Sequence, residues 1–323
     1  MIPTDESLRS ARRAGALAGA AAAGALSAGA WAASPNGYVL AGAILACVGA
    51  GVFVYRLVTR KTRRRLAVLA RPFPHAWQQV LDRRVAFYAA LGDDDEKLRF
   101  RKLLAVFLDE TPITPSGVEV DDTCRVLVAA SAVIPIFALP AWEYDMLREV
   151  IVRGEQFDFL FPGAPRETEG IQGLVGTTGG AFNGTMVLSK ADLLRGFENR
   201  PGKHNVGIHE FAHLIDKADG AVDGIPASLP RPCLRPWMLL VRQELQRGLG
   251  GRSDIPEYAF TNEQEFFAVA AEYFFQAPDE LAANHPELYD LLQRTFRQDT
   301  RTRLRGLVRK LARRRSRRGE GPG

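Results

Sequence analysis

Residues 205–216 read Asn-Val-Gly-Ile-His-Glu-Phe-Ala-His-Leu-Ile-Asp and contain the pattern His-Glu-x-x-His at positions 209–213. Two histidines four positions apart lie on one face of a helix, so their imidazole nitrogens can reach one metal ion. Glu210 lies on an adjacent face, near enough to take a proton from a water activated by the metal. The flanking residues are mostly apolar, as in a core helix. The stretch predicts a buried helix that binds zinc; the alternative is a structural helix with packed histidines.

A catalytic zinc takes three protein ligands and keeps one position for water, so a third ligand is required. Asp219 follows the helix at an offset used by some zinc proteases, but without the glycine turn that precedes theirs. The other source is an apolar stretch at 262–275, where Glu265 and Glu272 are seven positions apart and share a helix face. A carboxylate on so apolar a helix needs a partner, because an unpaired buried charge is very costly. The residues alone leave both sources open.

Several motifs are similar to those of the Mlc titration factor A (MtfA)-like zinc metallopeptidases. The matching stretches are 205–216, 223–226, Tyr258 and 265–275, with shorter matches at 187–189 and 296–299. They occur in the family's order and spacing and cover roughly residues 70–300.

The resemblance implies that His209, His213 and Glu265 bind one zinc ion per chain, that Glu210 is the general base and that Tyr258 assists at the metal. It implies an α+β fold, namely a mostly helical zincin-like (gluzincin) metallopeptidase domain with a small β-sheet. The implied activity is peptidase action, often aminopeptidase-like. At least one family member binds a transcriptional repressor, which makes such a regulator a candidate partner beside the peptide or protein substrate.

Two further carboxylates are expected to support the ligands. Glu272, two turns after Glu265, is better placed to hold a ligand histidine than to bind the ion. Asp216, one turn after His213, is expected to do the same. We also expect a strand at 185–189 to bind substrate along its edge, which makes Val187 and Leu188 candidate substrate-binding residues; the alternative is an interior strand.

The remaining pattern indicates mixed α and β structure. It predicts helices at 75–91, 95–109, 124–135, 191–197, 206–217, 237–249, 261–276 and 286–296, and strands at 150–152, 156–161 and 185–189. The glycine-rich stretch 173–184 is not followed by Gly-Lys-Ser/Thr, so we expect a hairpin or flexible loop there and not a phosphate-binding loop.

Charge is unevenly distributed along the chain. Since residues 1–65 contribute +7 and residues 301–323 contribute +9 to a total of +5, residues 66–300 carry −11. The basic isoelectric point therefore comes from two short flanks, which argues against a nucleic-acid-binding protein. Three cysteines, at positions 47, 124 and 233, provide no disulfide framework and are expected to be buried small apolar residues.

The N-terminal region, 1–65, is expected to form a transmembrane helical hairpin. Two stretches, about 14–34 and 38–58, are near the ~20 residues that a spanning helix needs, and neither has a charged residue before Arg56. The first is rich in Ala and Gly, which permits close packing against the second; the alternative is a cleaved signal peptide. The basic cluster at 60–65 predicts a cytoplasmic end. We therefore expect the inner (cytoplasmic) membrane of a bacterium, with a 66–300 peptidase domain in the cytoplasm.

The C-terminal segment 301–323 has ten Lys or Arg residues within 301–318 and apolar residues at helical spacing. This pattern favours a basic amphipathic helix that contacts membrane lipids; the alternative is a solvated tail. Taken together, the sequence predicts a membrane-tethered, cytoplasmic zinc peptidase. The alternative function is a zinc-containing binding protein that sequesters a transcriptional regulator without catalysis.

Overall fold

The structure is a computed structural model that describes residues 9–10, 13–21, 24, 37–154, 173–175, 184–198, 202–248, 250–251 and 253–307. The chain divides into two compact units, Met1–Pro72 and Phe73–Gly323, which are described separately. The predicted strand at 156–161 and residues 308–323 of the predicted basic tail lie outside the described residues.

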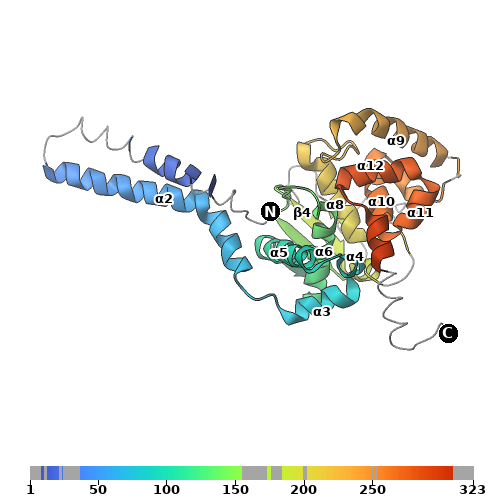
Figure 1. The fold of residues 1–323 in the computed structure, drawn as a ribbon, viewed down its shortest axis with the longest axis horizontal. Coiled ribbons are helices and arrows are strands. Elements are labelled where there is room, and N and C mark those ends of the chain that lie inside the picture. The colour runs from blue at the N-terminus through green and yellow to red at the C-terminus, as the bar shows by residue number, and fades with distance from the viewer. Residues whose placement is uncertain are drawn as a thin grey trace. The chain divides into compact units, whose positions relative to one another are not determined.

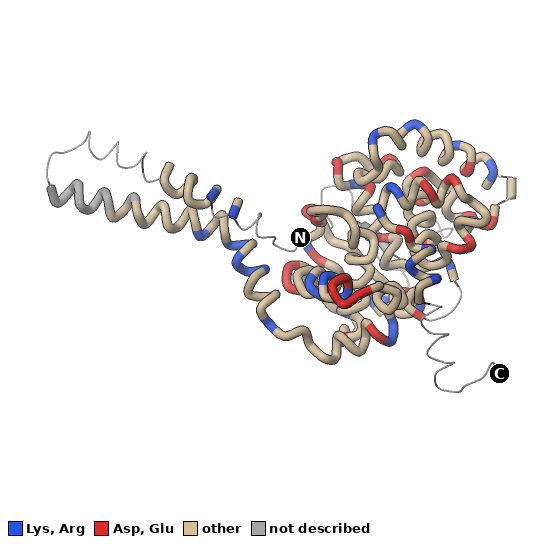
Figure 2. The backbone as a smooth tube through the Cα atoms, viewed as in Figure 1, with Lys and Arg blue, Asp and Glu red and all other residues tan. Residues whose placement is uncertain are grey.

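The N-terminal unit contains the long helix α2 (Gly37–Leu69) and a shorter helical stretch at 13–21. A Cβ on Gly19 would lie 2.7 Å from the carbonyl oxygen of Gly51, so the two helices pack backbone to backbone, as the small residues predict (Figure 1). α2 continues without a break through the basic cluster at 60–65, which stands out in Figure 2. None of the helices in the described part of the chain is long and apolar enough to cross a membrane. The predicted span at 38–58 is therefore not confirmed, and residues 22–23 and 25–34 of the other predicted span lie outside the described residues.

The C-terminal unit contains a four-stranded sheet with the order β1-β2-β4-β3. Its strands are β1 (Ile113–Ser116), β2 (Glu149–Arg153), β3 (Gly173–Val175) and β4 (Thr185–Ser189). β1, β2 and β4 are mutually parallel, and β3 runs antiparallel to β4. Within this sheet β4 lies at the centre, and all five of its residues are buried.

That position overturns the predicted substrate-binding edge. Val187 pairs with Ile151 of β2 on one side and with Leu174 of β3 on the other. Val187 and Leu188 are also buried in the core. Because both backbone edges of β4 are occupied, a substrate cannot add to this strand, and the prediction for these two residues is wrong.

Helices make up most of the C-terminal unit (Figure 1). They are α3 (His75–Arg84), α4 (Ala86–Ala90), α5 (Asp94–Glu110), α6 (Asp122–Ile136), α7 (Lys190–Gly196), α8 (Val206–Asp216), α9 (Leu234–Gly248), α10 (Glu263–Gln276), α11 (Pro278–Asn284) and α12 (Pro286–Phe296), with 3-10 turns η1 (Lys217–Asp219), η2 (Arg231–Cys233) and η3 (Glu257–Phe260). The helix expected over 75–91 is two helices that meet at Val85, which has a non-helical backbone. β1 and α11 are additions to the predicted elements. β3 lies in the glycine-rich stretch, and its antiparallel pairing with β4 agrees with the hairpin expected there.

Three apolar helices, α6, α8 and α10, form the centre of the core. α8 crosses α6 at very short range, because a Cβ on Gly207 would lie 2.0 Å from Ser131 Oγ. Glycine at position 207 therefore permits this approach. One face of α8 therefore packs against α6, and a neighbouring face of α8 packs against α10.

Candidate metal centre

The candidate centre lies between α8 and α10, which pack side by side (Figure 1). Both helices begin at an asparagine whose side chain caps the first turn. Asn205 Oδ1 accepts a hydrogen bond from the N–H of Ile208, and Asn262 Oδ1 accepts one from the N–H of Glu265. Such caps stabilise a helix start by about 1 kcal/mol. They fix the starting residue of each helix and thereby the faces on which its functional side chains lie.

His209, His213 and Glu265 converge at this interface, with their potential ligand atoms all within 4.8 Å of one another. The two Nε2 atoms of the histidines are 3.2 Å apart. Glu265 presents Oε2 at 3.1 Å from His209 Nε2 and Oε1 at 3.5 Å from His213 Nε2. The structure thus brings together the three residues that the sequence assigns to the metal.

The spacing of these atoms fits zinc. Ligand atoms bound at about 2.0–2.1 Å to a tetrahedral zinc ion lie about 3.3 Å from one another. The two Nε2 atoms are 3.2 Å apart, and the Glu265 oxygens lie 3.1 Å (Oε2 to His209) and 3.5 Å (Oε1 to His213) from them, close to that value. Two imidazoles and one carboxylate are also a donor set that catalytic zinc commonly has, with a position left for water. The residues present therefore fit a catalytic zinc ion.

Glu272 contacts His209 at Nδ1, the ring nitrogen that does not face the cluster. Its Oε1 lies 2.7 Å from His209 Nδ1, and its Oε2 accepts the backbone N–H of Asn205 at 2.5 Å. An Nδ1–H donated to a carboxylate leaves the Nε2 lone pair available for a metal. Glu272 therefore has the supporting position that its spacing from Glu265 predicts.

Charges within the centre are strongly coupled. Burial alone would lower the pKa of His209, but hydrogen bonds with Glu265 and Glu272 raise it well above its ordinary value. Burial would likewise raise the pKa of Glu265, yet contacts with the two histidines hold it far below the ordinary value. The carboxylate at position 265 is consequently ionised, which is the form that binds a cation.

Glu210 and Tyr258 face the same cluster. Glu210 is almost fully buried, and burial raises the pKa of its carboxyl although both histidines oppose the change. Tyr258, on η3, has its ring 6.2 Å from the His209 ring between centroids, and its side chain remains partly exposed. Burial and the neighbouring Glu265 raise the pKa of the Tyr258 hydroxyl. Glu210 is therefore poised as a base, and Tyr258 keeps its proton and can donate it in a hydrogen bond.

Two aspartates near α8 have other roles. The side chain of Asp219 accepts the backbone N–H of Ala221 at an exposed turn, outside the cluster. Asp216 is fully buried, and its Oδ2 accepts the N–H of Gly224 at 3.1 Å, while its Oδ1 has no hydrogen-bond partner among the described residues. Asp216 thus fastens the turn after α8, and the predicted hydrogen bond to a histidine is not seen among the described residues.

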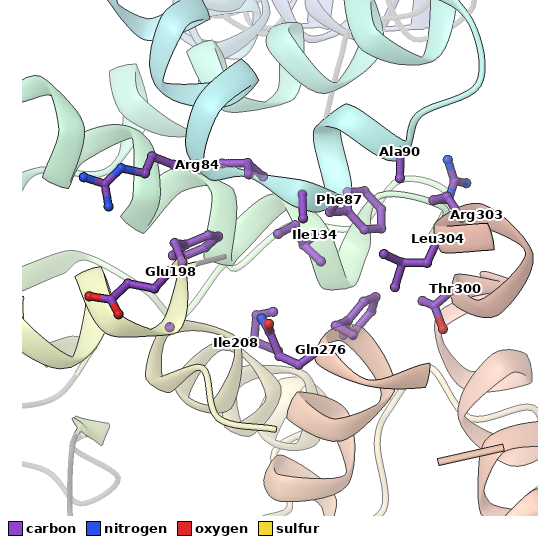
Figure 3. A pocket seen from close by; sticks show the side chains of 15 residues that line it. Arg84, Phe87, Ala90, Ile134, Glu198, Ile208, Gln276, Thr300, Arg303 and Leu304 are labelled. Atoms are coloured by element: carbon purple, nitrogen blue, oxygen red, sulfur yellow. The ribbon is translucent and has the colours of Figure 1, made fainter. Parts of the chain in front are cut away.

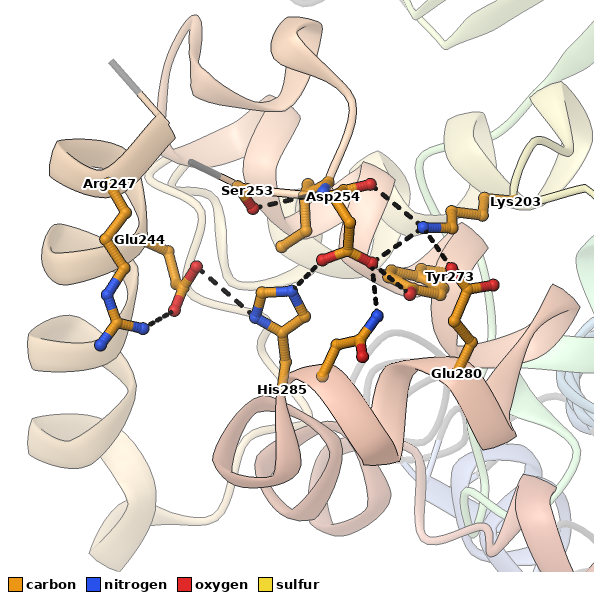
Figure 4. A network of polar contacts seen from close by, with 10 residues as sticks. Lys203, Glu244, Arg247, Ser253, Asp254, Tyr273, Glu280 and His285 are labelled. Atoms are coloured by element: carbon orange, nitrogen blue, oxygen red, sulfur yellow. Dashed lines mark hydrogen bonds and ion pairs between the residues drawn. The ribbon is translucent and has the colours of Figure 1, made fainter. Parts of the chain in front are cut away.

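A polar network that we did not predict from the sequence lies at the far end of α10. Asp254, in the loop before η3, accepts hydrogen bonds from several segments that are distant in the chain (Figure 4). Nothing in the sequence around a single loop aspartate indicates that side chains from distant segments meet at its carboxylate. By contrast, the capping role of Asn205 follows from an Asn immediately before an apolar helix.

A cavity of about 70 Å³ lies elsewhere in the C-terminal unit, away from the cluster. Phe87, Ile134, Ile208, Phe275 and Leu304 form much of its wall (Figure 3). Charged side chains, Arg84, Glu198 and Arg303, also line the cavity, and none of the candidate metal ligands does, although Ile208 directly precedes His209. The chemistry of the centre is therefore not located in this cavity.

Comparison with known proteins agrees with the geometry of the centre. The chain is 28% identical over 245 residues to the uncharacterized protein slr2042 of Synechocystis sp., covering 72% of this chain and 87% of the relative. It is 26% identical over 247 residues to the Mlc titration factor A of Pectobacterium atrosepticum, covering 71% and 88%. It is 29% identical over 225 residues to that of Salmonella agona, covering 65% and 82%.

The model of one protein family, described as glucose-regulated metallo-peptidase M90, matches residues 59–297. The matched region contains α8, η3 and α10, and hence every residue that meets at the cluster. A match over most of the chain, with the two histidines and the glutamate at ligand spacing, leads to one conclusion: this chain belongs to the MtfA-like, glucose-regulated metallo-peptidase M90 family.

Proposed function

We propose that the protein is a zinc-dependent peptidase that hydrolyses peptide bonds at the His209–His213–Glu265 centre. The observation that carries the proposal is the convergence of two imidazole Nε2 atoms, 3.2 Å apart, with the Glu265 carboxylate, whose two oxygens lie 3.1 and 3.5 Å from them, beside a buried glutamate at position 210. Membership of a metallo-peptidase family supports it.

The chain supplies a role for each group near the ligands. Zinc, when bound, supplies Lewis-acid polarisation of the scissile carbonyl and acidifies water. Glu210 takes a proton from the attacking water and delivers it to the leaving amine, for which a raised pKa is suitable. Tyr258 donates a hydrogen bond to the oxygen that gains charge in the transition state. Glu272 keeps the ring of His209 oriented throughout.

Glu210→Gln tests this assignment directly. The variant keeps the shape of the side chain and all three ligands, but it cannot accept the proton. We expect zinc content equal to that of the parent protein and loss of peptide hydrolysis in a peptide-library digest. Hydrolysis at the parent rate by the variant would exclude Glu210 as the base.

We further propose that the cleavage is aminopeptidase-like. The support is the resemblance of the motif residues to those of the MtfA-like metallopeptidases. A digest of matched peptides with free and acetylated N-termini tests it. Preference for the free amine is expected, and equal cleavage of both peptides would contradict an aminopeptidase.

A second candidate function is the binding of a transcriptional regulator without catalysis. The observation that favours it is the name of several relatives, Mlc titration factor A. The Glu210→Gln variant separates the two functions, because a binding protein would keep its biological effect when hydrolysis is lost.

We also propose that the N-terminal unit associates with the bacterial inner membrane and leaves the peptidase centre in the cytoplasm. Exposed apolar side chains on α2, including Leu45 and Phe53, support the proposal, together with the arginines that follow at 56, 60 and 63 (Figure 2). Basic residues near an anionic lipid surface contribute roughly 1 kcal/mol each. Co-flotation of the full chain with anionic but not neutral vesicles is expected, and removal of residues 301–323 should weaken it if the basic tail takes part.

A further inference from the structure

Asp254 is the meeting point of four side chains from three separate parts of the C-terminal unit. Its Oδ2 accepts hydrogen bonds from Lys203 Nζ at 2.9 Å, Tyr273 Oη at 2.6 Å and Asn284 Nδ2 at 2.9 Å. Its Oδ1 lies 2.6 Å from His285 Nε2 (Figure 4). The main-chain carbonyl of Asp254 also accepts Lys203 Nζ, at 3.1 Å. Both the side chain and the backbone of this loop residue are therefore held.

The network is charged as well as hydrogen-bonded. Burial would raise the pKa of Asp254, but the hydrogen bonds from Tyr273 and Lys203 hold it far below the ordinary range. Lys203 also forms an ion pair with Glu280 at 2.8 Å and lies 4.2 Å above the ring of Tyr273. Hydrogen bonds to ionised groups are about twice as strong as neutral ones. Asp254 lies at the surface, with 34% of its side chain exposed, but it is held there by several charged and polar partners.

This anchor fixes one end of the segment that contains Tyr258. The other end of the segment is Asn262, which caps α10. From Asn262 to Tyr273 the helix rises about 17 Å, at 1.5 Å per residue. The segment 254–262 therefore runs back along α10 with both ends fixed, and Tyr258 lies midway between them. Its ring lies 6.2 Å from the His209 ring between centroids.

The same aspartate also reaches the start of the zinc-binding helix. Lys203 precedes Asn205 by two residues, and the N–H of Asn205 donates to Glu272. Tyr273, a second donor to Asp254, directly follows Glu272 in α10. One carboxylate thus connects the three chain segments that place Tyr258, Glu272 and the first turn of α8.

We infer that Asp254 is a positioning residue for the proposed peptidase reaction, acting through Tyr258. The kinetic effect expected from this inference rests on the proposed function, because it assumes that the protein hydrolyses peptides. Asp254 touches none of the three ligand residues among its described contacts, so its removal should leave the metal in place. What changes is the placement of the Tyr258 hydroxyl when charge develops on the substrate.

A double-mutant cycle on the full chain tests the inference. Asp254→Asn should lower kcat about tenfold or more, with little change in KM and no change in zinc content. In a Tyr258→Phe background the same change should alter kcat by less than about twofold, because the group on which it acts is absent. If Asp254→Asn lowered kcat by the same factor in the parent and in the Tyr258→Phe background, the inference would be overturned.

Asp279→Asn is the matched control. Asp279 is an exposed carboxylate on α11 that binds Arg301 and Arg305 and has no contact with the Asp254 network among the described residues. It should leave kcat unchanged. If Asp254→Asn fails to fold, Asn284→Ala removes one donor only and replaces it in the cycle.

Hydrogen exchange provides a readout that does not need activity. In Asp254→Asn, peptides covering 253–262 and 202–206 should exchange faster than in the parent protein, while α6 peptides stay protected. Unchanged exchange at 253–262 would also overturn the inference. If the parent protein hydrolyses no peptide, the proposed function fails, and the exchange result still decides whether Asp254 orders the Tyr258 segment.

Discussion

Glu272 Oε1 lies 2.7 Å from His209 Nδ1, so a residue of α10 determines which nitrogen of a histidine on α8 faces the metal cluster. The other oxygen of Glu272 binds the backbone at Asn205, the cap of the same helix. One buried carboxylate therefore fixes both the ring of a ligand and the start of its helix. The metal centre is thus built across the helix interface and not on α8 alone.

This relationship predicts a large effect from a change that preserves shape. Glu272→Gln keeps a hydrogen-bond acceptor but removes the charge behind His209. Loss of such a supporting carboxylate typically lowers metal affinity about 10–100-fold. Competition with a chromophoric chelator measures the affinity. Glu263→Gln, an exposed position on the same helix, is the control and should bind zinc like the parent protein.

The third ligand can be decided by metal analysis. Glu265→Ala should purify without stoichiometric zinc, because two histidines alone are left to hold the ion. Asp219→Ala should retain zinc, since that side chain only caps an exposed turn. Full zinc in the first variant together with loss in the second would reverse the assignment.

Gly207→Ala should destabilise the C-terminal unit. The added methyl group would lie 2.0 Å from Ser131 Oγ and 2.6 Å from Ser131 Cβ, so α6 and α8 would have to separate. Overpacking of this kind costs about 1–3 kcal/mol. Urea unfolding of the variant measures the loss. Gly202→Ala, where a Cβ meets no atom within 4 Å, should be nearly neutral, and equal stability of the two variants would contradict the close helix approach.

Asp216 should make stability depend on pH. Burial raises its pKa from 3.8 to about 6, although the N–H of Gly224 opposes the shift. When the pKa of a carboxyl is higher in the folded protein than in the unfolded chain, the free energy of unfolding decreases as the pH rises between these two pKa values. Asp216→Asn lacks this loss.

The free energy of unfolding in urea, measured with a chelator present, should therefore be higher for the variant relative to the parent at about pH 7.5 than at about pH 4. The comparison is between variant and parent at each pH, which cancels the other titrating groups. A difference that is the same at both pH values would show that Asp216 does not titrate in this interval.

The helices of the metal centre were readable from the sequence because several local signals agree there. Asn205 and Asn262 are caps, the residues between them and the helix ends are apolar, and the histidines have helical spacing. Pairing of strands has no such local signal. β4 was predicted, but its parallel neighbour β2 ends more than 30 residues earlier, and only its antiparallel neighbour β3 is adjacent in the chain. The apolar run Met186-Val-Leu188, without the alternation of a half-exposed strand, was the available clue in the sequence.

Short elements and convergent networks were harder to predict. β1 has four residues and includes Pro115, which is unusual within a strand. α11 has seven residues and begins at Pro278. The Asp254 network depends on residues from 203 to 285 meeting at one carboxylate, and this follows only from the packing of α10 against its neighbours.

His213 and Glu265 are 52 positions apart in the chain, yet they lie on either side of one ion site. An ion held by both closes the intervening chain into a loop, as a disulfide bond would, and removes conformations from the unfolded state. Any ligand that binds only the folded state also raises the free energy of unfolding as its concentration increases. We therefore expect the cellular lifetime of the protein, as well as its chemistry, to follow the supply of metal, because a chain that has lost its ion opens more often to degrading proteases.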